Sequence, residues 1–161
     1  MRIEKVVVNS SPLIVLFRSG QADLMHRLFN EVIVPEQVYA EVLAGRKDDT
    51  ARILLPRTNW VIRKKVEITH PVAAWNLGNG ESAVFSYVIG ASNARALVDD
   101  LAARRCAQAF GIQTLGTGAL LVLAKRRGLI ESVKDRIQLL KDAGLYLSDH
   151  IVQLLITEAA E

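Results

Sequence analysis

Cysteine is nearly absent from this chain of 161 residues, because Cys106 is its only one. A single thiol excludes an internal disulfide framework and any zinc cluster built on cysteines. Cys106 lies in an alanine-rich stretch with helical spacing, so we interpret it as a buried structural thiol. The three histidines, His26, His70 and His150, are far apart and lack the spacing of metal ligands. A zinc site built on these residues is therefore not expected.

Long apolar runs are also lacking, and no stretch approaches the roughly 20 residues that a membrane helix needs. The apolar run near the N-terminus is too short, and the residues before it are too charged, for a signal peptide. We therefore expect a cytoplasmic protein. Half of the residues are hydrophobic and under a quarter are charged, as in folded globular proteins. Without repeats or an obvious linker, we expect one domain over residues 1–161.

The excess of positive charge is small, with a formal net charge of +3. Its distribution says more than its size, because basic clusters at 63–65, 104–105 and 125–127 lie apart from the acidic residues. Basic clusters on helices are most often solvated faces, and phosphate contacts are the alternative interpretation.

Short, continuously apolar runs predict buried strands over residues 6–8, 32–34, 60–62 and 96–98, with a weaker one at 113–115. Between and after them, helical patterns cover residues 12–18, 22–29, 36–43, 82–89, 101–110, 119–127, 133–143 and 149–159. This alternation predicts an α/β protein with a central parallel sheet of four or five strands and right-handed crossovers. In such sheets, ligands gather outside the carboxyl ends of the strands.

Polar and acidic residues stand at those predicted strand ends. Asn9 follows the first strand, Asp99 and Asp100 follow the fourth, and Glu81 opens a helix after a glycine-rich turn. Glu41 lies at the edge of the buried stripe of the helix at 36–43. Each has a structural explanation: the aspartates as helix caps, Glu81 as a first-turn acid, Glu41 as a rim charge and Asn9 as part of a turn.

Taken together, these side chains favour a metal site. Clustered carboxylates repel one another and raise each other's pKa values unless a cation lies between them. Hard divalent ions prefer oxygen ligands, and they assist the cleavage of phosphodiesters. By contrast, residues 116–118 lack the further glycine of a dinucleotide site and the Gly-Lys of a phosphate loop, so they are better interpreted as a turn with Thr117 as helix N-cap.

The chain resembles the PIN-domain superfamily, most closely its small prokaryotic branch related to VapC-type toxins. The matching segments are residues 7–14, 32–42, 78–84, 97–104, 116–121 and 124–130. Each segment is a weak signal alone, but they follow the order of the family over nearly the whole chain.

The resemblance implies a three-layer α/β/α fold and a Mg²⁺- or Mn²⁺-dependent ribonuclease. By motif position, the catalytic residues would be Glu41, Glu81 and Asp99, and the metal ligands Asn9, Glu81, Asp99 and Asp100. Ser11, Arg104 and Thr117 would line the pocket or contact RNA. The resemblance further implies the toxin of a type II toxin–antitoxin pair, a small antitoxin protein as partner, a homodimer and no membrane association.

One residue departs from the pattern of the family. PIN nucleases usually carry an aspartate at the end of the first strand, where this chain has Asn9. An amide oxygen can coordinate an ion but brings no charge. The alternative hypothesis is therefore a catalytically weak PIN-like module that binds nucleic acid or protein.

Overall fold

The computed structural model of the protein describes residues 5–161. Its sheet has five strands, all parallel, in the order β3-β2-β1-β4-β5. The strands are β1 (Lys5–Val8), β2 (Glu31–Pro35), β3 (Val61–Lys64), β4 (Ala94–Leu97) and β5 (Thr114–Leu115). The helices are α1 (Ser10–Arg18), α2 (Asp23–Leu28), α3 (Glu36–Leu43), α4 (Thr50–Leu54), the 3₁₀ helix η1 (Leu55–Arg57), α5 (His70–Ala73), α6 (Asn79–Ile89), α7 (Leu101–Ala109), α8 (Thr117–Arg126), α9 (Val133–Asp142) and α10 (Asp149–Glu158).

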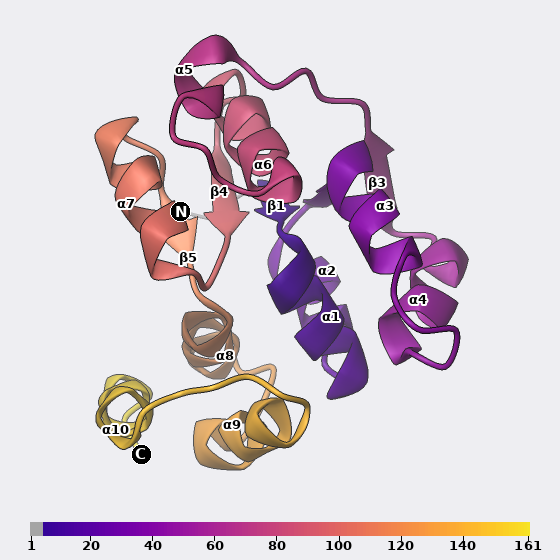
Figure 1. Ribbon diagram of the computed structural model, residues 1–161. Coiled ribbons are helices and arrows are strands. Elements are labelled where there is room, and N and C mark those ends of the chain that lie inside the picture. The colour runs from indigo at the N-terminus through magenta and orange to yellow at the C-terminus, as the bar shows by residue number, and fades with distance from the viewer. Residues whose placement is uncertain (1–4) are drawn as a thin grey trace.

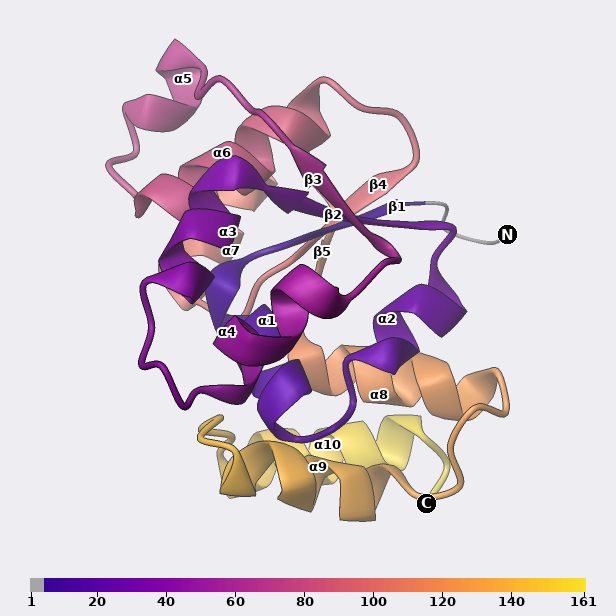
Figure 2. The ribbon, with the colours of Figure 1, turned by 90° about the vertical axis from the view of Figure 1, so that its right-hand side faces the viewer.

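Helices cover both faces of the sheet (Figures 1 and 2). Helices α3, α6 and α7 lie on one face, and α1, α2 and α8 lie on the other, with α4 packed beside α1. Helices α9 and α10 pack on α8 and on each other, outside the layer that touches the sheet. The predicted three-layer α/β/α architecture is confirmed, and the sheet has the larger of the two expected strand numbers.

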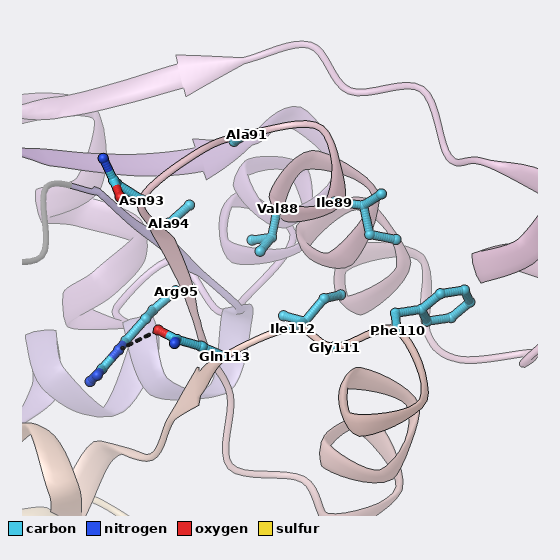
Figure 3. A pocket seen from close by; sticks show the side chains of 10 residues that line it. All are labelled: Val88, Ile89, Ala91, Asn93, Ala94, Arg95, Phe110, Gly111, Ile112 and Gln113. Atoms are coloured by element: carbon cyan, nitrogen blue, oxygen red, sulfur yellow. Dashed lines mark hydrogen bonds between the residues drawn. The ribbon is translucent and has the colours of Figure 1, made fainter.

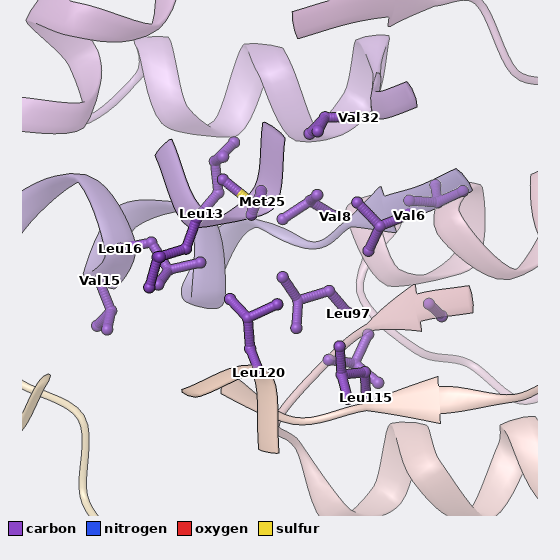
Figure 4. Close-up of a cluster of buried hydrophobic side chains, with 14 of the residues drawn as sticks. Val6, Val8, Leu13, Val15, Leu16, Met25, Val32, Leu97, Leu115 and Leu120 are labelled. Carbon is purple, nitrogen blue, oxygen red and sulfur yellow. The ribbon is translucent and has the colours of Figure 1, made fainter. Parts of the chain in front are cut away.

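The core explains why the strands are so apolar. Val6, Val7 and Val8 of the central strand are fully buried, because helices pack on both faces. Figure 4 shows one side of this core, where side chains from strands and helices converge: Val6, Val8, Leu13, Leu16, Met25, Leu97, Leu115 and Leu120. Burying an aliphatic side chain of this size contributes roughly 1.5–3 kcal/mol to folding.

Several helix boundaries differ from the sequence patterns. Helix α1 begins at Ser10, earlier than predicted, and α6 begins at Asn79 rather than at residue 82. The short helices α4 and α5 were not predicted, because four or five residues carry too little periodicity. No helix in the described part of the chain is long and apolar enough to span a membrane.

The side chain of Glu161 caps a helix that is distant in sequence. Its carboxylate accepts hydrogen bonds from the backbone N–H groups of Val133 (2.6 Å) and Lys134 (3.3 Å) at the start of α9, and from Lys125 Nζ (3.0 Å). The N–H of Val133 lowers the pKa of this carboxyl group most, and Lys125 and Lys134 add to the effect. Glu161 therefore fastens the chain segment after α10 to α8 and α9.

We predict that Glu161→Ala lowers the melting temperature at neutral pH. A lowered pKa means that the contribution of Glu161 is present above the ordinary value of 4.5 and is lost as the pH falls through the lowered folded-state value. Thermal unfolding of both proteins across pH 3–8 measures this, and the two curves should converge at the acidic end. Glu158→Ala is the matched control, because the Glu158 side chain forms no hydrogen bond among the described residues. Equal losses in both variants would contradict the capping role.

Candidate functional site

The strand order reverses between β1 and β4, and open α/β sheets form a crevice at such a reversal, at their carboxyl edge. Strands β2 and β3 lie on one side of β1, and strands β4 and β5, which come later in the chain, lie on its other side. In open α/β sheets, ligands bind at this reversal, outside the strand ends. Helices α1, α6, α7 and α8 begin at this edge, which Figure 1 views end-on. Their first N–H groups favour anionic groups in the crevice.

Glu41 reaches this edge from α3. Its Oε1 atom accepts a hydrogen bond from Ser10 Oγ, in the first turn of α1, at 3.0 Å. The same carboxylate lies against the backbone of Gly80 in α6, so closely that a Cβ atom at position 80 would collide with Oε1. Glu41 therefore joins α1, α3 and α6 at one point, and the missing side chain of Gly80 makes room for it.

Glu81 follows directly in α6 and is half-buried. Burial raises the pKa of its carboxyl group above the ordinary value of 4.5, and the negative charges of Asp100 and Glu41 raise it further. The structure thus brings Glu41, Glu81 and Asp100 into electrostatic reach of one another.

Asp99 is held by Thr117 at the start of α8. Its Oδ1 accepts a hydrogen bond from the Thr117 backbone N–H at 2.8 Å, and its Oδ2 accepts one from Thr117 Oγ1 at 2.6 Å. Arg104 lies beside this pair, with its Nε donating to the carbonyl oxygen of Val98 at 3.3 Å and its guanidinium group against Gly116. Asp99, Thr117 and Arg104 therefore form a contiguous group that connects β4 to α7 and α8.

Asp100 has a different role from Asp99. It is the N-cap of α7, and its Oδ2 accepts a hydrogen bond from the backbone N–H of Ala103 at 3.0 Å. The capping interpretation is therefore correct for Asp100. The cap uses only Oδ2 and the residue is exposed, so Oδ1 remains available to a cation.

Asn9 and Ser11 lie at the end of β1. Asn9 is buried, and its backbone N–H donates to the carbonyl oxygen of Leu97 at 3.1 Å, which ties β1 to β4. It is the N-cap residue of α1, but its side chain makes no capping hydrogen bond. Ser11 is exposed, and the serine that contacts a candidate site residue is Ser10. The sequence pattern missed Ser10 because α1 starts earlier than predicted, and no signal distinguishes the two adjacent serines.

The donor atoms at this edge suit a hard divalent cation. Carboxylate and amide oxygens are the ligands that Mg²⁺ prefers, and Mg²⁺ usually takes one or two carboxylates together with waters and phosphate oxygens. Within residues 5–161, no three Asp, Glu, His or Cys side chains are gathered closely enough to hold an ion by themselves. The fit rests on Glu81, whose charge is opposed by two carboxylates and would be stabilised by a cation between them.

We predict that Gly80→Ala displaces Glu41 without unfolding the protein. The new methyl group would collide with Glu41 Oε1, which is the end of a flexible side chain, so the carboxylate turns away and loses its bond to Ser10. Replacing a helical glycine by alanine stabilises by about 0.4–1 kcal/mol, which roughly offsets the lost hydrogen bond. A crystal structure and a melting curve of the variant measure both effects. An unmoved Glu41 carboxylate would contradict the prediction.

A hollow of about 600 Å³ lies at the opposite, amino edge of the sheet. Its apolar wall consists of Val88, Ile89, Phe110 and Ile112, from the ends of α6 and α7 and the loop before β5. Figure 3 shows Arg95 on the other side of β4, where its Nε donates to Gln113 Oε1 at 3.4 Å. The hollow contains none of the candidate site residues, and its one charged side chain points away from its apolar wall.

Comparison with known proteins identifies the family. A model of the PIN-domain family matches residues 5–161, which is nearly the whole chain. No curated protein and no solved structure matches it significantly. The family match agrees with the parallel sheet between two helical layers and with the family that the sequence motifs indicate. The chain belongs to the PIN-domain family.

Proposed function

We propose that this protein is a Mg²⁺- or Mn²⁺-dependent endoribonuclease that cleaves RNA phosphodiester bonds. PIN domains are generally nucleases and typically use divalent metal ions. The observation that carries the proposal is that Glu41 and Asp100 lie near enough to Glu81, at the topological switch point of the sheet, for their negative charges to raise the pKa of the Glu81 carboxyl group.

In this proposal, Glu41, Glu81 and Asp99 are the catalytic acids, and Asn9, Glu81, Asp99 and Asp100 would hold the ion. A bound Mg²⁺ or Mn²⁺ would polarise the phosphodiester and lower the pKa of an attacking water. The protein holds two of the acids in place, because Ser10 bonds to Glu41 and Thr117 bonds to Asp99.

Exposed cations lie on both flanks of the acids and support an RNA substrate. Lys64 pairs in register with Pro35 at the carboxyl end of β2, so Lys64 and Lys65 lie at the same sheet edge as the site. On the other flank, Arg105 lies in the second turn of α7, five positions after Asp100. These three side chains are exposed and form no ion pair within residues 5–161. An RNA backbone across this edge would meet a cation on each side of the acids.

The test is a cleavage assay with labelled single-stranded RNA on protein stripped of metal by a chelator. We expect cleavage after Mn²⁺ or Mg²⁺ is added back, none with the chelator, and none for Asp99→Asn. Glu158→Gln, on α10 and outside the crevice, is the matched control and should cleave like the wild type. Calorimetry on the same samples measures ion binding separately. A wild type that neither binds the ion nor cleaves RNA would refute the proposal.

A binding module without turnover is the second candidate, and Asn9 favours it. An amide in place of the usual aspartate removes one negative charge from the ion site, which weakens ion binding. Under this alternative, the wild type binds RNA but does not cut it, and Glu81→Gln binds RNA more tightly because negative charge leaves the crevice. Cleavage by the wild type that is lost in Asp99→Asn decides for the nuclease.

The proposal extends to a role as the toxin of a type II toxin–antitoxin pair, with a small antitoxin protein as partner and a homodimer as the assembled form. The support for these finer points is the resemblance of the motifs to VapC-type toxins. Light scattering on the purified protein measures the oligomeric state directly. Growth arrest on induced expression, absent in Asp99→Asn, would support the toxin role.

A further inference from the structure

Thr117 is a fully buried polar residue at the start of α8, with 0% of its surface exposed. It donates one hydrogen bond to each oxygen of Asp99: the backbone N–H to Oδ1 at 2.8 Å and the hydroxyl group to Oδ2 at 2.6 Å. Two bonds from one residue to both oxygens fix the plane of the carboxylate as well as its position. A hydrogen bond of this kind to a charged acceptor is about twice as strong as a neutral one.

The backbone around Thr117 is itself held from two sides. The Arg104 guanidinium lies against Gly116, and the Leu155 side chain of α10 lies against Gly118. A side chain at either glycine would collide with these groups, so both neighbours of Thr117 are small enough for close packing. The first turn of α8 therefore has little freedom to move, and neither has the carboxylate that it holds.

We propose that Thr117 is a positioning residue, which orients Asp99 toward the crevice and does not contact RNA itself. This inference rests on the proposed function, in which Asp99 is a catalytic acid and a metal ligand. The buried hydroxyl group already donates to Asp99 and is shielded from solvent, so it is out of reach of a substrate. Residues that orient a metal-binding carboxylate in this way typically change metal affinity or activity by about 10–100-fold when they are replaced.

The test compares Thr117→Val, which keeps the shape and the backbone N–H but removes the hydroxyl group, with Thr117→Ser, which restores the hydroxyl group. We expect Thr117→Val to weaken Mn²⁺ binding about 10–100-fold in calorimetry without RNA, and to lower kcat while KM for RNA is unchanged. Thr117→Ser should recover most of the Mn²⁺ affinity and most of the kcat. Thr114→Val on β5 is the control, because the Thr114 side chain makes no hydrogen bond within residues 5–161. Thr117→Ala replaces the valine variant if the latter does not fold.

A double-mutant cycle separates this role from general stabilisation. If Thr117 acts through Asp99, adding Thr117→Val to Asp99→Asn should change the metal-free melting temperature much less than adding it to the wild type. Additive losses of stability, or a raised KM with unchanged Mn²⁺ affinity, would overturn the proposal. An inactive wild type would refute the proposed function but not the coupling of Thr117 to Asp99. The metal-free cycle measures that coupling without any activity.

Discussion

Glu81→Gln is expected to abolish RNA cleavage while leaving the metal-free protein at least as stable as the wild type. The glutamine keeps the size of the side chain but removes the charge that would bind the ion. A bound ion supplies several kcal/mol of transition-state stabilisation, and losing about 3 kcal/mol of it lowers kcat by more than about 100-fold. Stability should not fall, because burial and the charges of Asp100 and Glu41 all oppose the ionised form of Glu81.

The combination of lost activity and retained stability is what distinguishes a functional acid from a structural one. Cleavage rates with Mn²⁺ and metal-free melting curves are measured on the same preparations. Glu67→Gln, in the exposed loop after β3, is the matched control and should leave both unchanged. A large fall in the melting temperature of Glu81→Gln would instead mean that Glu81 is a first-turn acid that stabilises α6.

The pH dependence of the same variant gives an independent check. Because the pKa of Glu81 is raised in the folded state, folded protein holds this proton more tightly than the unfolded chain does. The associated stability is present below the ordinary value of 4.5 and is lost as the pH rises through the raised folded-state value. The melting temperature of Glu81→Gln minus that of the wild type should therefore be positive at neutral pH and vanish below pH 4.5.

The largest loss of stability is expected for Phe85→Ala. Phe85 is fully buried on α6, the helix that packs on β1, β2 and β4. Truncating a buried phenylalanine leaves a cavity and costs about 3–5 kcal/mol, against roughly 5–15 kcal/mol for the stability of a whole domain. For a domain of this size, that loss lowers the melting temperature by about 6–20 °C.

Urea unfolding monitored by circular dichroism measures the change in the free energy of unfolding. Ile89→Ala on the same helix is the control, because Ile89 is 46% exposed and its truncation should cost far less. Similar losses for the two variants would mean that α6 does not pack on the sheet as described.

The fold was predictable because its strands are buried on both faces. The apolar run at Val6–Val8 can be recognised as a buried strand from its own residues, without knowing which strands pair with it. The alternation of such runs with helical patterns then implies parallel strands. The edges of the fold were less predictable: β5 has two residues, and α4 and α5 are short. Such elements form because larger neighbours pack against them, so their own residues carry a weak signal.

The candidate site was predictable to the extent that its residues follow strands. Asp99 and Asp100 come directly after β4, and any parallel sheet brings that point to the carboxyl edge. Their different tasks were not predictable, since two adjacent aspartates look alike in sequence. Asp100 turns back to the N–H of Ala103, while Asp99 points across to Thr117, 18 positions away.

The sequence by itself determined the family, the layered α/β architecture and the position of Asp99 and Asp100 after a strand, because the local hydrophobic pattern and the order of the motifs can be read along the chain. Only the tertiary structure decided which acids face one another and what holds them. Glu41 meets Ser10 from 31 positions away, and it fits only because Gly80 has no side chain. Such contacts depend on how helices pack in three dimensions, and no local pattern of residues records that packing.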